Sequence, residues 1–256
     1  CCESVDLSKY NVGYSESNKE TLARLIQTFI DKYPELYHIR SYSFTIRNST
    51  YITSVNFNYY YTAAEYKSMN NEVDSAVDKY FGDVIVDFKA DKLSDDQLLL
   101  LLHDRIAAVC EYDYDNYQLE QETGNSYISD DSYNMYGTLV KKIAVCQGYA
   151  KTYQMILNDL GIENWLCSSS TLSHVWNIVE LGGKYYHVDV TWDDPVYDIS
   201  GQVYHNNFLR STNGIKETDH EADDFDTTPT DTTYDHYFRP NTHPSHAYLD
   251  GNSNNI

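Results

Sequence analysis

Cys146 is the first residue whose position indicates chemistry. In AVCQGYAKTYQMILNDLG (144–161), apolar residues recur at helical spacing after the cysteine, and Gly161 ends the pattern. A helix N-terminus favours a thiolate because its unpaired N–H groups carry partial positive charge. Gly148 lets the backbone approach its neighbours closely. Cys146 is therefore a candidate nucleophile, although a free cysteine is also a common core residue.

A histidine and an aspartate share one face of a predicted β-hairpin. The segment HVWNIVELGGKYYHVDVTW (174–192) has two β-rich runs joined by Gly182-Gly183, a strong hairpin signal. With the glycines as the loop, His174 pairs with Thr191 and is the diagonal neighbour of Asp189, at roughly 7–8 Å between backbones. An imidazole and a carboxylate meet across that gap.

These three residues have the chemistry that thiol-dependent acyl transfer needs. Cys146 would be the nucleophile, His174 would take and return the proton, and Asp189 would orient the imidazole. Alone, each has an ordinary structural explanation: a core thiol, a half-buried polar group on a sheet, and a strand-end carboxylate bonded to backbone. Their shared register favours a Cys-His-Asp catalytic triad.

The preceding elements form a predicted α+β lead-in module over residues 1–92. Residues 18–33 have a helical apolar stripe, and the alternating segments on either side of residues 48–50 predict a hairpin. A helix over 63–80 follows, and GDVIVDF (82–88) predicts a short strand or extended connection.

Residues 93–215 are the predicted catalytic core. Ser94 and Gln97 form a capping-box pattern that starts a helix running to about Glu111. A polar stretch, 112–137, predicts a long surface loop before the cysteine helix. Strands follow from Trp165 onward, and the acidic, Thr-rich extension over 216–256 predicts a loosely packed tail. The fold class is α+β, with the cysteine helix packed on an antiparallel sheet.

Composition excludes several functions. The chain has 256 residues, with 18 Lys plus Arg against 39 Asp plus Glu, and the resulting net charge of −21 argues against nucleic acid as a partner. The five cysteines lack the CxxC spacing of a zinc site, so we expect no metal and no cofactor. No apolar run is long enough to span a bilayer. A start of Cys-Cys followed by a polar stretch leaves lipid attachment through Cys1 as one of two open alternatives.

Four segments together resemble the bacterial branch of the transglutaminase-like superfamily, which has a papain-like core. They cover about residues 94–212 and are HDRIAAVCEYDYD, AVCQGYA, HVWNIVELGGKYYHVDVTWDDP and YHNNFLRS. The resemblance implies that Cys146 is the nucleophile, His174 the general base and acid, and Asp189 the orienting acid. Residues 1–92 carry no motif of this kind.

An acyl-transfer site also needs hydrogen-bond donors for the oxyanion that forms during the reaction, and the sequence leaves the second of these donors open. The backbone N–H of Cys146 is one expected donor. Papain-type enzymes use a glutamine six residues before the cysteine, but Val140 stands there, and Tyr133 and Tyr136 are candidates by position only.

Other polar residues of the segments have structural explanations. Asp193 and Asp194 are weak evidence for a calcium site, because no further oxygen ligands follow them at the spacing of such a site. We expect Cys110 and Cys167 in the core and His103 as a packed or capping residue.

The sequence thus predicts an extracellular or cell-surface cysteine-dependent acyl-transfer enzyme: a peptidase, amidase or transamidase. Its partner would be a protein or peptide substrate, with cell-wall peptide as a narrower case. Membrane contact is expected only through a lipid anchor at Cys1. The competing hypothesis is a non-catalytic surface binding module that keeps the fold.

Overall fold

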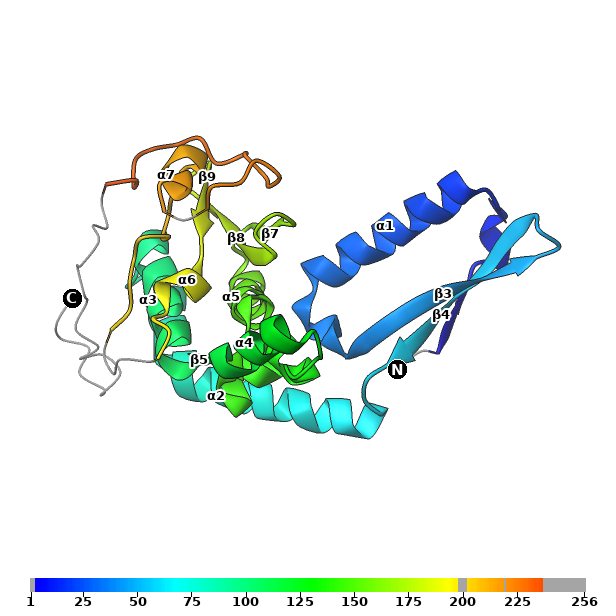
Figure 1. Ribbon diagram of the computed structural model, residues 1–256, viewed down its shortest axis with the longest axis horizontal. Coiled ribbons are helices and arrows are strands. Elements are labelled where there is room, and N and C mark those ends of the chain that lie inside the picture. The colour runs from blue at the N-terminus through cyan, green and yellow to red at the C-terminus, as the bar shows by residue number, and fades with distance from the viewer. Residues whose placement is uncertain (1–2, 198–201, 219, 237–256) are drawn as a thin grey trace. The chain divides into compact units, whose positions relative to one another are not determined.

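The computed structural model describes residues 3–197, 202–218 and 220–236 (Figure 1). The chain divides into two compact units, Cys1–Asn71 and Glu72–Ile256. Both units combine helices with an antiparallel sheet, and the predicted α+β class is therefore confirmed. The division falls inside the long helix α2 (Ala63–Lys89), whereas the sequence placed a boundary after residue 92. Cys1 and its proposed lipid lie outside the described residues.

The first unit is built around the predicted hairpin. Its elements before α2 are β1 (Ser4–Asp6), β2 (Val12–Gly13), α1 (Glu16–Lys32), β3 (Ile39–Arg47) and β4 (Tyr51–Tyr59). β3 pairs with one edge of β4, while β1 and β2 pair with the other, all antiparallel. Asn48 and Ser49 turn the hairpin with φ of 52° and 54°. The predicted helix and hairpin are confirmed.

The second unit holds the predicted triad. Its elements after α2 are α3 (Asp95–Val109), β5 (Glu111–Tyr112), α4 (Tyr114–Thr123), β6 (Ile143–Ala144), α5 (Cys146–Leu160), β7 (Asn164–Ser169), β8 (His174–Leu181), β9 (Lys184–Val188), α6 (Val190–Asp193) and α7 (Thr212–Lys216). The strands β7, β8 and β9 form an antiparallel sheet in that order. α5 packs on β7 and β8, and α3 packs beside α5.

The segment GDVIVDF is helical, so the predicted strand there is wrong. Phe81 and Val84 are buried and continue the helical spacing of the apolar face of α2. The guanidinium of Arg105 on α3 donates to the Asp83 carboxylate, at 2.8 Å to Oδ2, and to the Tyr80 carbonyl oxygen at 2.8 Å. Packing against α3 therefore extends one helix through a β-branched run whose local propensity favours a strand.

The stretch from 112 to 137 is more ordered than the predicted surface loop. It contains α4 and a 3-10 turn over Asp130–Tyr133, and a π-helical turn over Gly137–Lys141 begins at its end. Ser132, Asn134 and Met135 are buried. The buried polar residues of this stretch form hydrogen bonds with the backbone and with other side chains. Their polarity alone therefore wrongly predicted exposure to solvent.

The hairpin register follows the prediction up to Val188. Leu181 pairs with Lys184 and Asn177 with Val188, and both loop glycines have positive φ, 62° and 79°. The predicted continuation of the strand through Trp192 is wrong. Asp189 caps the short helix α6 instead, and β9 exchanges backbone hydrogen bonds with the segment around Arg210.

The described part of the C-terminal extension packs into the unit, and the expectation of a loosely packed tail does not hold there. Ala222 and Phe225 join a core cluster with Trp176, Ile178 and other residues of the sheet. Asp224 Oδ2 accepts a hydrogen bond from the Thr171 N–H at 2.9 Å. The acidic side chains thus bind donors of the β7–β8 hairpin while the apolar ones between them are buried.

Candidate functional site

Cys146 is the first residue of α5, as predicted, and is partly exposed. Val145, in extended conformation, is the N-cap, so the N–H of Cys146 has no intrahelical acceptor. A Cβ on Gly148 would lie 2.6 Å from the Ser132 carbonyl oxygen and 2.8 Å from Ala144 Cβ, which explains the glycine. The tight packing behind Gly148 fixes where the thiol stands.

His174 and Asp189 meet, although Asp189 lies at the N-cap of α6 and not in the predicted strand. His174 Nε2 donates to Asp189 Oδ2 at 2.6 Å, and both side chains are buried. The other carboxylate oxygen, Oδ1, accepts from the backbone N–H groups of Thr191 at 3.0 Å and Trp192 at 3.3 Å. The N-cap of α6 therefore holds the carboxylate in place for the imidazole.

Cys146 lies beside the His174 ring, where the thiol contributes to raising the pKa of the imidazole. Because Nε2 is engaged by Asp189, Nδ1 is the ring nitrogen left for the thiol. Burial lowers the pKa of His174, but the charge and hydrogen bond of Asp189, together with Cys146, outweigh it and raise the pKa to about 10. The structure thus brings all three predicted residues together in the order cysteine, histidine, aspartate.

Two tryptophans fix the histidine ring. Trp192 stacks on His174 with ring centroids 4.6 Å apart and 15° between planes, and Trp176 stacks at 5.6 Å and 20°. Trp176 Nε1 donates to His187 Nδ1 at 3.0 Å, while burial and the His220 charge lower the pKa of His187 to about 3. A neutral His187 therefore anchors one of the two stacking rings.

The sequence analysis missed Tyr112, which lies near the thiol. Tyr112 pairs with Ala144 in the parallel ladder β5–β6, two residues before Cys146. Burial, followed by the charge of Cys146, raises the pKa of Tyr112, so its phenol keeps its proton. This pairing links segments more than thirty residues apart, and no local pattern signals it.

Tyr133 and Tyr136, the two candidates for the second oxyanion donor, have different surroundings. The pKa of Tyr133 is raised by burial and then by the charges of Glu120 and Cys146, and its side chain is 36% exposed. Tyr136 instead donates to Glu72 Oε2 at 3.1 Å.

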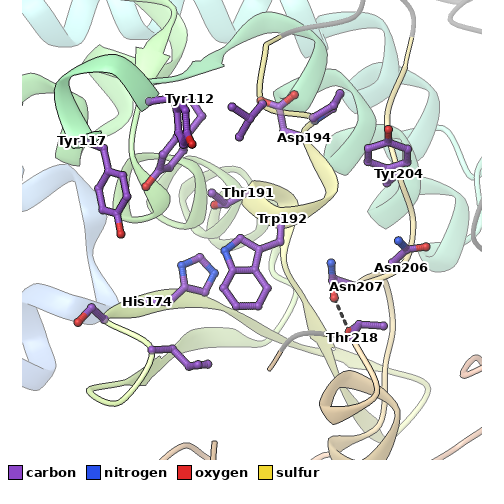
Figure 2. Close-up of a pocket in the computed structure, with 15 residues that line it drawn as sticks. Tyr112, Tyr117, His174, Thr191, Trp192, Asp194, Tyr204, Asn206, Asn207 and Thr218 are labelled. Atoms are coloured by element: carbon purple, nitrogen blue, oxygen red, sulfur yellow. Dashed lines mark hydrogen bonds between the residues drawn. The ribbon is translucent and has the colours of Figure 1, made fainter. Parts of the chain in front are cut away.

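A cavity of about 540 Å³ opens beside the histidine. Figure 2 shows the His174 ring beside Trp192, with Tyr112 and Tyr117 across from them. Asn206, Asn207 and Thr218 supply amide and hydroxyl groups to the lining, whose described residues include no Lys or Arg. Asp194 is the acid among these described lining residues, and its Oδ2 accepts from the Tyr149 hydroxyl at 2.6 Å. The cavity suits an uncharged group with hydrogen-bonding and apolar parts.

A second buried polar network surrounds His103, which the sequence treated as a packed residue. His103 Nδ1 lies 2.9 Å from Asp104 Oδ1 and Nε2 lies 3.2 Å from Asp193 Oδ2. Asp104 Oδ1 also accepts from His205 Nε2 at 2.7 Å, and Asp193 Oδ1 accepts from the Asn207 side chain at 3.0 Å. These contacts join α3 to the segments after the hairpin.

Two groups in the described residues place three potential metal-ligand atoms within 4.8 Å of one another. They are His103, Asp104 and His205, and His174, Asp189 and His220. In each group one carboxylate oxygen accepts from both imidazoles. Hydrogen bonding within each group therefore satisfies these atoms without an ion.

Cys110 and Cys167 are free and buried, as predicted. Burial raises the pKa of both thiols, that of Cys167 to about 12. Cys146 is thus the one of these three thiols that is partly exposed. No described helix is both long and apolar enough to cross a membrane.

Comparisons with known proteins found a likeness to a solved structure but no matching family. No protein-family model matches the chain, and no curated protein matches it. A solved structure described as "Crystal structure of a TGase" aligns with 60% of this chain and 44% of that chain, at 12% identity and a TM-score of 0.39. The chain therefore spans less than half the length of that protein.

Proposed function

We propose that this chain is a cysteine-dependent acyl-transfer enzyme acting on amide bonds through a thioester, with Cys146, His174 and Asp189 as its triad on a transglutaminase-like, papain-like core. The supporting observation is the thiol at the start of α5 beside His174, whose Nε2 lies 2.6 Å from the buried Asp189 carboxylate. Three residues from three elements converge in the arrangement that nucleophilic catalysis requires.

The proposed reaction has two halves. The thiolate of Cys146 attacks the amide carbon while His174 holds the proton, and the imidazolium then protonates the departing amine, leaving a thioester on Sγ. In the second half His174 removes a proton from water or an acceptor amine, which attacks the thioester and frees the thiol. Asp189 stays ionised and stabilises the imidazolium throughout.

The oxyanion of each half would be held by two donors, the Cys146 N–H and the Tyr112 hydroxyl. Tyr112 pairs with Ala144, two residues before the cysteine, and lines the cavity beside His174. Tyr112→Phe is expected to lower kcat about 10²-fold, because one donor to the developing charge is lost. Tyr136→Phe is the matched control, since Tyr136 bonds to Glu72; equal losses in both variants would refute the role of Tyr112.

The cavity supports an uncharged protein or peptide segment as the acyl donor. Apart from the His174 imidazolium, its described lining includes tyrosines, tryptophan, amides and hydroxyls and has no Lys or Arg to bind a substrate carboxylate. Peptidase, amidase and transamidase activities all fit, with cell-wall peptide as one substrate. The extracellular location and lipid attachment at Cys1 stay predictions of the sequence.

Native labelling tests the proposal. Iodoacetamide is expected to modify Cys146 rapidly at neutral pH, with Cys110 and Cys167 protected, as mapped by mass spectrometry. A p-nitrophenyl ester should give a burst of product and a mass increase on Cys146. Cys167→Ala is the control and should keep the burst. Labelling of Cys146 without any acyl adduct would favour the non-catalytic binding module.

A further inference from the structure

The carboxylate of Asp189 has a fourth donor, from a residue that the triad does not include. His220 Nε2 lies 3.0 Å from Asp189 Oδ2, the same oxygen that His174 Nε2 contacts at 2.6 Å. With the two backbone donors on Oδ1, each oxygen of the carboxylate accepts two hydrogen bonds. Two imidazoles thus share one carboxylate oxygen at the centre of the proposed site.

His220 is held rigidly in this position. The side chain is fully buried, and Nδ1 lies 2.8 Å from the Thr218 carbonyl oxygen. The ring packs against Trp192 at 4.0 Å and Trp176 at 4.9 Å between centroids. These are the two tryptophans that stack on His174, so both histidines share one aromatic cage.

We infer that His220 is a positioning residue that acts through Asp189, as a second donor that limits how tightly the carboxylate holds the protonated His174. The inference rests on the proposed function, and it assigns a role to the acidic C-terminal segment. Ala222 and Phe225 anchor that segment in the core two and five residues after His220.

The physical basis is competition for one oxygen. Burial raises the pKa of Asp189, but the charge and hydrogen bond of His174 and those of His220 outweigh it and hold the pKa well below its usual range. A carboxylate that accepts two imidazole donors is a weaker base toward each. Without His220, Asp189 would bind the imidazolium of His174 more tightly, and His174 would release its proton to the leaving group more slowly.

Among the described residues, few other titratable groups face His174 and His220. His174 faces Cys146 from α5 and Asp189 from the cap of α6. His220 faces Asp189 and the neutral His187 of β9. Asp189 is thus the shared anion through which removal of His220 would reach His174.

Two variants separate the donor from the ring. His220→Phe keeps an aromatic ring between the tryptophans and removes the donor, whereas His220→Gln keeps a neutral N–H donor and removes the ring. In His220→Phe we expect the His174 pKa, followed by NMR of labelled histidine, to rise by about one unit. kcat should fall about tenfold with KM unchanged, and His220→Gln, which keeps a donor without the charge, should restore both values in part.

The NMR titration needs no substrate, so absence of turnover would refute the proposed function and leave this test intact. Equal behaviour of His174 in wild type and His220→Phe would overturn the inference, as would equal shifts in both variants, since keeping an N–H donor at this position would then make no difference. The titration is repeated with EDTA and with Zn²⁺. A His174 shift that follows chelation of the wild type would assign the contact to a bridging metal and also overturn it.

Discussion

Replacing Asp189 by asparagine is expected to lower kcat/KM by about 10³- to 10⁴-fold with the fold intact. Asparagine is a good N-cap, so its side-chain oxygen can keep the Oδ1 contacts to the Thr191 and Trp192 N–H groups. The amide nitrogen would then face His174 Nε2 as a donor. His174 would accept there and carry its proton on Nδ1, toward Cys146, where it could no longer receive the thiol proton.

The same substitution has an electrostatic signature. Burial lowers the pKa of His174, and the charge and hydrogen bond of Asp189 are the strongest influences that raise it. In Asp189→Asn burial therefore dominates, and the His174 pKa falls below its usual range. The measurements are burst kinetics with an activated ester and the NMR titration of His174. Asp223→Asn is the control, because this acid is exposed and bonds to Lys216. Full activity in Asp189→Asn would exclude the triad.

The centre of the site could be predicted because one local turn fixes it. Gly182 and Gly183 both adopt positive φ, and a two-residue loop of this kind sets the register of every pair in the hairpin. The start of α5 is equally local, since Val145 precedes the helix and Gly161 ends it. The register sets Val188 opposite Asn177, and Asp189 follows as the N-cap of α6, where it contacts His174.

The rest of the site depends on contacts that join distant segments. Tyr112 reaches the thiol through a parallel pairing with Ala144, and His220 reaches Asp189 from beyond α7. Neither contact has a periodic pattern, because a short parallel pair and a single buried histidine leave no repeat in the chain. The acidic composition around His220 indicated solvent exposure, yet these acids bind donors such as the Trp165 indole.

The buried network around His103 predicts a loss of stability at alkaline pH. Burial lowers the pKa of His103, but the hydrogen bonds and charges of Asp104 and Asp193 outweigh it and raise the pKa from 6.5 to about 9. A pKa raised on folding means that the stabilisation is complete below about 6.5 and is lost as pH rises through about 9. The loss is on the order of 3 kcal/mol, and the lowered pKa of Asp104 describes the same interaction and is counted once.

Asp193→Asn is expected to lower the free energy of unfolding by about 3–5 kcal/mol at pH 6, because it leaves His103 charged with one anion removed. The side chains of both residues are fully buried, so water cannot replace the lost partner. Urea unfolding at pH 6 and pH 10 measures the effect. The difference from wild type should shrink at pH 10, where His103 is neutral in both proteins, whereas Asp223→Asn should change little at either pH. A deficit of equal size at both pH values would mean that Asp193 stabilises the unit through Asn207 alone, without an imidazolium at His103.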